Sequence, residues 1–279
     1  MANGRRILVT GVARGLGRAF VEAAVARGHR VAGTVRSAAD IDKVRAWGVT
    51  PVLLDLMDEA AIAPAVGEVE AALGGVDVLV NNAGYGHEGV LEESSGAALR
   101  RQFQVGVFAP VALIRALLPG MRAQRSGHIV NVTSMAGSVG LPGISFYCGA
   151  KFALEGISES LGKEVKLFGI HVTAFAPGQF RTGWAGDAMD RSPRAIPDYD
   201  ALFDPLRAAR LAKSGRQAGD PAKAAEVLMA VLDAPNPPAR VFVGPDALAL
   251  AGQKVKRLSA EIAGWDAIGR ATDFTPSSD

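Results

Sequence analysis

Two side chains that could exchange a proton stand four residues apart in Tyr147-Cys148-Gly149-Ala150-Lys151, and Ser134 lies shortly before them. On a helix, residues at this spacing share one face, a turn apart. An ammonium beside a phenol favours the phenolate, and a phenol ordinarily titrates near pH ~10. The pair is therefore a candidate acid and base for the proton on an alcohol or ketone oxygen. The same spacing is common on solvated helix surfaces, so the pair needs support from the rest of the chain.

A glycine-rich stretch near the N-terminus supplies that support. Thr10-Gly11-Val12-Ala13-Arg14-Gly15-Leu16-Gly17 lies between a predicted strand at 5–10 and a predicted helix at 16–27. Glycines there let the backbone approach a pyrophosphate, whose charge is met by the first amides of the helix. The spacing is G-x-x-x-G-x-G, and a glycine-rich turn without a ligand is the alternative. The strand–loop–helix context favours nucleotide binding.

Two arginines bear on which nucleotide would bind. Arg14 lies within the glycine loop, and Arg36 follows the second predicted strand, where Val35 leaves no carboxylate. An acid near that point accepts a ribose hydroxyl in NAD-specific folds, whereas an arginine suits a 2′-phosphate. Either arginine alone could be surface, but both together favour NADP. Asp55, after the third strand, could bind an adenine amino group or cap the next helix.

Apolar, β-branched runs alternate with amphipathic stretches along most of the chain. Strands are predicted at 5–10, 29–35, 50–54, 76–80, 127–132, 171–176 and 240–243. Helices are predicted at 16–27, 39–47, 59–73, 95–105, 108–124, from Tyr147 to about 168, at 221–232 with Asp220 as its N-cap, and at 247–265. This alternation predicts an α/β fold with a parallel sheet and right-handed crossovers.

We expect one domain over residues 1–279. Residues 183–217 are rich in Gly, Pro, Arg and Asp with weak periodicity, which is typical of a substrate lid inserted after the sixth strand. Residues 246–279 form a C-terminal extension. The helix bearing Tyr147 and the one before the fifth strand carry enough apolar surface to suggest a homodimer.

Composition excludes several classes of partner and site. A net charge of +2 gives no reason to expect nucleic acid or an anionic membrane surface. No unbroken apolar run approaches roughly 18 residues, so no transmembrane helix is expected. The four histidines lack Cys or carboxylate partners at ligand spacing, so no metal site is predicted. The single Cys148 cannot form an internal disulfide, which favours the cytoplasm, and we expect it to be core packing.

These motifs occur together in an order that resembles the short-chain dehydrogenase/reductase family. The order is Thr10…Gly17, Asn81-Asn82-Ala83-Gly84, Ser134, Tyr147-x-x-x-Lys151 and Pro177-Gly178…Thr182, over about the first 185 residues. Residues 147–156 are similar to the hydroxysteroid dehydrogenase-like branch. Asn82-Ala83-Gly84-Tyr85-Gly86 and Gly219-Asp220-Pro221 also resemble a related group of bacterial oxidoreductases. The resemblance implies a doubly wound, seven-stranded parallel sheet of the Rossmann type that carries NAD(P)(H).

The resemblance also implies residue roles. Tyr147 would be the general acid/base, Lys151 would lower its pKa and hold the nicotinamide ribose, Ser134 would bind the substrate oxygen, and Thr182 the carboxamide. Further cofactor-binding candidates are Gly11, Arg14, Gly15, Leu16, Gly17, Arg36, Asp55, Leu56, Asn82, Ala83, Gly84, Pro177 and Gly178. Met135, Leu141, Phe146, Phe180 and Trp184 are substrate-pocket candidates, with Met189 and Tyr199 as further lid aromatics or apolar groups. Those after Pro177-Gly178 could equally be ordinary packing of the lid.

One position departs from the family pattern. Gly106 stands where the family usually has an Asn that helps to hold a water beside the lysine. A glycine weakens this proton relay, or leaves room for more water. Three interpretations follow: an NADP(H)-dependent oxidoreductase on a ketone or secondary alcohol, a silenced nucleotide-binding regulatory protein, and a lyase or epimerase that retains its nicotinamide. The intact Ser134, Tyr147 and Lys151 favour the first.

Overall fold

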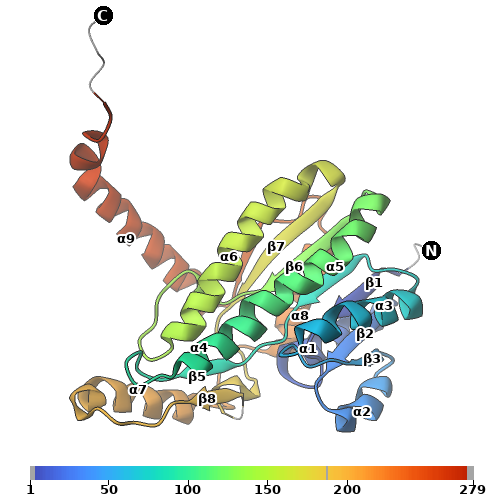
Figure 1. Cartoon of the computed structure of the whole chain (residues 1–279), viewed down its shortest axis with the longest axis horizontal. Coiled ribbons are helices and arrows are strands. Elements are labelled where there is room, and N and C mark those ends of the chain that lie inside the picture. Colours follow the sequence, from blue (N-terminus) through green and yellow to red (C-terminus); the bar gives the residue numbers. More distant parts are fainter. Residues whose placement is uncertain (1–3, 187, 275–279) are drawn as a thin grey trace, which may run out of the picture.

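Seven parallel strands form a single sheet at the centre of the molecule (Figure 1). This computed structural model describes residues 4–186 and 188–274. Across the sheet the strands lie in the order β3 (Thr50–Leu53), β2 (Arg30–Val35), β1 (Arg6–Val9), β4 (Val78–Asn81), β6 (Gly127–Val132), β7 (Ile170–Pro177), β9 (Arg240–Val243). The order reverses between β1 and β4, so the predicted doubly wound sheet is confirmed.

Helices cover both faces of this sheet. In chain order the α-helices of the described residues, including α7 of the lid and the outlying α9, are α1 (Gly15–Ala26), α2 (Ile41–Arg45), α3 (Ile62–Leu73), α4 (Gly96–Phe103), α5 (Ala109–Gln124), α6 (Ser145–Val165), α7 (Asp200–Lys213), α8 (Pro221–Asp233) and α9 (Pro245–Arg270). Ile7 and Val9 of β1 join the core beneath α1 and α8, and Leu8 joins the core beneath α3 and α5. A strand buried on both faces needs a continuous apolar run, which is why β1 reads as Ile-Leu-Val.

The two helices predicted at 95–105 and 108–124 are one continuous helical stretch. α4 passes into α5 through a π-helical turn at Gln104–Phe108, with Gly106 buried in it. Single π-turns of this kind occur mostly inside longer helices and often near functional sites. The stretch Gly96–Gln124 is long and apolar enough to cross a membrane by length and composition, a test that helices of a soluble core also pass. In the fold, α5 packs against α3 and β6.

The lid contains regular structure that the sequence did not predict. Its strand β8 (Met189–Arg191) pairs in parallel with β5 (Gly86–Glu88) to make a second, two-stranded sheet, and α7 follows. In Figure 1, α7 and β8 lie together below α4 and beside β5. The lid is therefore built onto the segment that follows β4.

The last helix leaves the body of the molecule. α9 begins at Pro245, directly after β9, and its first turn is fixed by Asp246, whose carboxylate accepts the backbone N–H of Gln179 at 2.8 Å. Ala247 is buried, but the rest of the helix projects away from the sheet and its covering helices (Figure 1). α9 is thus longer than the predicted 247–265.

Candidate active site

A cleft of about 810 Å³ opens at the carboxyl ends of the strands. Its walls come from the β1–α1 loop, the ends of β2, β3 and β4, the segments after β6 and β7, helix α6 and the lid. Doubly wound sheets bind their ligands at this edge, beside the point where the strand order reverses.

The glycine loop forms a cradle that only glycines can build. Gly11 and Gly15 have φ of 70° and 62°, in the left-handed region. A Cβ added to Gly17 would lie 2.3 Å from the carbonyl oxygen of Gly11. Arg14, the N-cap of α1, is extended and makes no side-chain cap, so the first amides of α1 are left without a capping partner. Lining glycines and uncapped amides fit the pyrophosphate of a dinucleotide.

Asn82 fastens the cradle to the next strand. Its Nδ2 donates to the carbonyl oxygens of Thr10 at 2.8 Å and Gly11 at 3.2 Å. In return, Thr10 Oγ1 accepts the backbone N–H groups of Asn82 at 3.0 Å and Ala83 at 2.9 Å. Asn82 lines the cleft as predicted, and it also holds together the two loops on either side of the switch point.

The opposite end of the cleft carries the side chains expected near a ribose and an adenine. Arg14 and Arg36 both line the cleft, and Arg36 is exposed to solvent. Asp55 also lines it, and its carboxylate accepts the N–H of Met57 at 3.0 Å. The cap of the following helical turn is Asp58, which accepts from Ala60 and Ala61. The capping alternative for Asp55 is therefore wrong.

Ser134, Tyr147 and Lys151 all line the cleft, and Ser134 and Lys151 both lie beside Tyr147. Tyr147 and Lys151 lie on α6 with exposed fractions of 8% and 5%, and Ser134 follows β6. Lys151 Nζ donates to the carbonyl oxygen of Val132 at 2.8 Å. The Trp184 indole of the lid leans on the Tyr147 ring, with ring centroids 5.0 Å apart.

Burial dominates the titration of both groups on α6. It raises the pKa of Tyr147 to about 12, and the nearby Ser134 hydroxyl opposes this shift. It lowers the pKa of Lys151 to about 8, opposed by the charge of Glu155. Lys151 is not among the groups that shift the pKa of Tyr147 in the protein by itself, so its expected effect on that pKa stays a prediction. The ammonium donates to the Val132 carbonyl and lies 5.7 Å from the centroid of the phenol ring.

Glu155 explains why Lys151 is free to face the cleft. One turn further along α6, this buried carboxylate is the natural ion-pair partner of the lysine. Its oxygens are engaged elsewhere: Oε1 accepts from Thr133 Oγ1 at 2.5 Å, and Oε2 from Arg240 Nε at 2.6 Å. Arg240, at the start of β9, thus holds the carboxylate that would otherwise pair with Lys151.

Around Gly106 the structure offers a side-chain amide that sequence reasoning missed. A Cβ on Gly106 would lie 3.3 Å from the Ala150 Cβ and 3.5 Å from Gln102 Nε2. Gln102 is buried, and its Oε1 has no partner among the described residues. Gln104, two residues before Gly106, points elsewhere and donates to the Leu56 carbonyl at 3.2 Å.

Cys148 is packed beneath this site. It is buried in a small cluster with Ala136, Ile144 and Tyr147, and burial raises the pKa of its thiol. Its Sγ accepts the N–H of Leu141 at 3.4 Å. The prediction that it is packing is confirmed.

Nearly all of the predicted residues line the cleft, and the exceptions, all candidates for the substrate pocket or lid, are Phe146, Met189 and Tyr199. Phe146 does not line the cleft, because one residue's rotation about α6 turns it away to stack on His87, with ring centroids 5.1 Å apart. Met189 is buried behind the wall, and Tyr199 donates to Glu92 at 2.8 Å. Predicted residues that line the cleft are Gly11, Arg14, Gly15, Leu16, Gly17, Arg36, Asp55, Leu56, Asn82, Ala83, Gly84, Ser134, Met135, Leu141, Tyr147, Lys151, Pro177, Gly178, Phe180, Thr182 and Trp184.

Other lining residues escaped the sequence reasoning. They include Tyr85, Arg101, Leu206, Arg210 and Lys213. Three of these belong to α7, for which no periodicity was recognised. Tyr85 lies in the segment after β4, where the sequence showed a family resemblance but gave no role for this residue.

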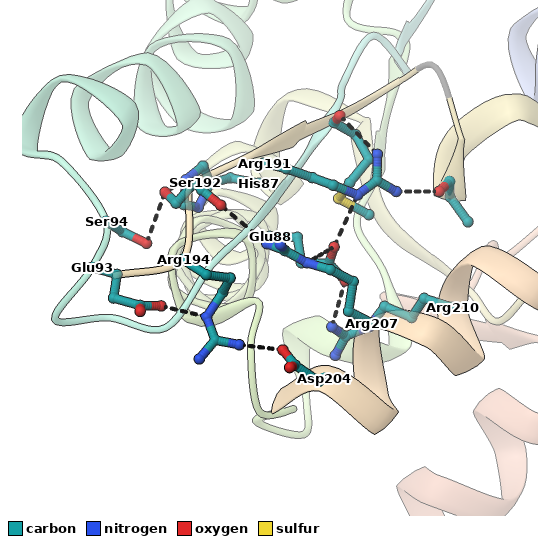
Figure 2. A network of polar contacts seen from close by, with 12 residues as sticks. His87, Glu88, Glu93, Ser94, Arg191, Ser192, Arg194, Asp204, Arg207 and Arg210 are labelled. Atoms are coloured by element: carbon teal, nitrogen blue, oxygen red, sulfur yellow. Dashed lines mark hydrogen bonds and ion pairs between the residues drawn. The ribbon is translucent and has the colours of Figure 1, made fainter. Parts of the chain in front are cut away.

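The lid is fastened by a buried carboxylate that faces three arginines (Figure 2). Glu88 of β5 is fully buried and pairs with Arg191 at 2.9 Å, Arg210 at 2.8 Å and Arg207 at 3.3 Å. A second buried carboxylate, Glu93, pairs with Arg194 at 3.0 Å. All four arginines come from the lid, so the lid is clamped to the segment after β4.

Comparisons with known proteins agree with this architecture. The family model described as short chain dehydrogenase matches residues 5–192. "Oxidoreductase BOA17" of Botryotinia fuckeliana is 36% identical over 268 residues, which cover 95% of this chain and 97% of that protein. "3-ketodihydrosphingosine reductase" of Bacteroides thetaiotaomicron is 34% identical, covering 86% of this chain and 87% of that protein.

Solved structures give the same result. A short-chain dehydrogenase from Streptomyces avermitilis superposes with a TM-score of 0.90 at 39% identity, covering 98% of this chain and 100% of that one. A short-chain dehydrogenase/reductase from Burkholderia phymatum in complex with NAD shares the fold, with a TM-score of 0.81 at 23% identity over 94% of this chain and 96% of that one. With the cradle, the sheet order and these matches together, the chain belongs to the short-chain dehydrogenase/reductase family of oxidoreductases.

Proposed function

We propose that this oxidoreductase uses NADP(H) to interconvert a ketone and a secondary alcohol. The observation that supports this most directly is the convergence of Ser134, Tyr147 and Lys151 in the same cleft as the glycine cradle. A bound nicotinamide supplies or accepts the hydride. The protein must then deliver a proton to the substrate oxygen, or remove one from it.

Each of the three side chains has a distinct task in that proton transfer. In the reduction, the Tyr147 hydroxyl donates its proton to the carbonyl oxygen as that oxygen gains negative charge, and in the oxidation the phenolate takes it back. The Ser134 hydroxyl donates a hydrogen bond to the same oxygen. The protonated Lys151 stabilises the phenolate that the reduction leaves behind.

The substrate end of the cleft favours a fairly apolar carbonyl compound. Met135, Leu141, Ile144 and Trp184 line it around Tyr147. The Bacteroides relative is named as a reductase of 3-ketodihydrosphingosine, which is a ketone. That name supports a ketone as the substrate class here.

The preference for NADP rests on Arg14 and Arg36. Both line the end of the cleft beside β2 and β3, and Val35 offers no carboxylate there. A guanidinium can hold a 2′-phosphate through paired hydrogen bonds, and it offers no acceptor for a ribose hydroxyl.

Replacing Tyr147 by Phe tests the proposed chemistry. We expect kcat for NADPH-dependent ketone reduction to fall by roughly 10²–10⁴-fold, because the general acid is removed. NADPH affinity, measured by fluorescence titration, should change less than about threefold. Tyr199→Phe, on the lid and outside the cleft, is the matched control and should leave kcat unchanged. Substantial turnover by Tyr147→Phe would refute the assignment.

Replacing Arg36 by Asp tests the cofactor preference. The wild-type protein should bind NADPH at least about tenfold more tightly than NADH, and the variant should lose that ratio because a carboxylate repels the 2′-phosphate. Arg45→Asp, also exposed and on the neighbouring helix α2, should leave the ratio unchanged. Equal wild-type affinities for the two cofactors would remove the argument from Arg14 and Arg36.

A further inference from the structure

α9 exposes a row of large apolar side chains that no described part of the molecule covers. Val255 is 64% exposed, Ile262 60% and Trp265 68%, and the helix stands clear of the body (Figure 1). Scattered single apolar residues on a surface are normal, but a contiguous row marks an interaction site.

The row follows a heptad spacing. Leu248, Ala251, Val255, Leu258, Ile262 and Trp265 are separated alternately by three and four residues. Apolar residues at this spacing form one seam along a helix and suit pairing with another helix. Ile268 lies just beside the end of the seam.

We propose that this seam pairs with the same seam of a second copy of the chain, in the antiparallel direction. Layers then join Leu248 to Trp265 of the second copy, Ala251 to Ile262 and Val255 to Leu258. The smallest residue of the seam faces a large one, and each contact occurs twice by symmetry. Six layers result, with a large side chain in every one.

Charges beside the seam select the antiparallel direction. In that register, Lys254 lies opposite Glu261 of the second copy, and the pair occurs twice. A parallel pair would instead place Glu261 opposite Asp266 of the second copy, and Lys254 opposite the uncharged Ser259. Opposite charges flanking a helical seam set partner and direction, and like charges oppose it.

The geometry of the molecule permits this arrangement. Because α9 extends outward from its root at Pro245, antiparallel pairing places the two bodies at opposite ends of the helix pair (Figure 1). This surface is separate from the α5 and α6 faces from which the sequence suggested a dimer.

A charge exchange across the proposed pair provides the test. Sedimentation equilibrium of the full chain over a concentration series should show an association step. Lys254→Glu and Glu261→Lys should each weaken that step by at least about tenfold, because each variant creates two like-charge pairs. The double variant Lys254→Glu/Glu261→Lys should restore it.

Matched controls separate this pairing from other causes. Lys256→Glu makes the same charge change on the outer face of α9 and should leave the step unchanged. Circular dichroism and thermal unfolding should show that all variants remain folded. Absence of the step in the wild type, equal behaviour of single and double variants, or a step that no α9 variant affects would each overturn the proposal. So would a monomer whose α9 instead binds phosphatidylglycerol vesicles in flotation.

Discussion

At the scale of single residues, Lys151 is the group whose environment says most about function. It is a buried cation whose hydrogen-bond partner among the described residues is the Val132 carbonyl, while the neighbouring Glu155 is held by Thr133 and Arg240. Burial without a carboxylate partner destabilises the ammonium, which is why its pKa falls to about 8. In the proposed mechanism, this cation without a carboxylate partner is available to stabilise the Tyr147 phenolate when it forms.

This environment predicts that Lys151→Met stabilises the fold while it impairs catalysis. Between pH about 8 and the unfolded value of about 10.5, the unfolded chain binds more protons at Lys151 than the native chain does. Wild-type stability therefore rises with pH across that window, and the buried charge costs most below pH 8.

Urea unfolding measures the effect directly. We expect Lys151→Met to unfold with about 1–3 kcal/mol more free energy than the wild type at pH 7, and the gap to narrow by pH 9.5. Lys163→Met, an exposed lysine on the same helix, is the control and should change stability by less than about 0.5 kcal/mol. A variant less stable than wild type at pH 7 would show that the lysine is adequately paired.

Much of the residue-level site could be read from the sequence, because spacing along a helix or after a strand fixes direction. Ser134, Tyr147 and Lys151 fall in the cleft for this reason. Burial could not be read, so the raising of the Tyr147 pKa by desolvation was not predicted. Phe146 was misplaced because adjacency in sequence means a rotation of about 100° on a helix.

At the scale of elements, the lid depends on β5 and on the carboxylate that β5 buries. Glu88 neutralises guanidinium groups from β8 and α7 together, so one side chain holds two lid elements (Figure 2). Glu88 is more than a hundred residues away in sequence from the arginines that it pairs with. Strands of three residues are also too short to show a periodic apolar pattern. This explains why neither β5 nor β8 was predicted.

Replacing Glu88 by Gln should loosen the lid. Removing one partner of a buried ion pair typically costs about 3–5 kcal/mol, because the remaining charges lose their compensation. We expect the free energy of unfolding to fall by roughly that amount, and trypsin to cut within 183–217 at least about tenfold faster.

Glu92→Gln, which alters an exposed neighbour bound to Tyr199, should have little effect on either quantity. Unchanged cleavage in Glu88→Gln would mean that the β5–β8 pairing and Glu93 suffice to hold the lid.

At the scale of the whole molecule, the sheet was predictable and the outward direction of α9 was not. Strands buried on both faces tend to be apolar throughout, so β1 and β4 were clear in the sequence, and the partly exposed edge strands β3 and β9 were still recognised from short apolar runs. The glycine loop placed β1 at the switch point. α9 was predicted as a helix, but its direction depends on where β9 ends and on the anchor at Asp246. From sequence alone, an apolar seam on a helix would be expected to pack against the rest of the same chain.

Antiparallel pairing of α9 also predicts how enzyme activity depends on protein concentration. The two bodies lie apart, and each cleft is lined by a single chain, so neither copy completes the other's site. Specific activity should therefore stay constant across the concentration range in which the pair forms. An activity that rose with association would show that the second copy reaches the cleft.

Cys148, the single cysteine of the chain, is buried beside Tyr147, and this makes it easier to measure association of two copies with a site-specific label. Its raised pKa and its burial keep it slow toward maleimides at neutral pH. A sulfhydryl installed on the outward helix would then be the fast-reacting one, and a single spin label or dye per subunit could report how far apart two molecules stand in solution.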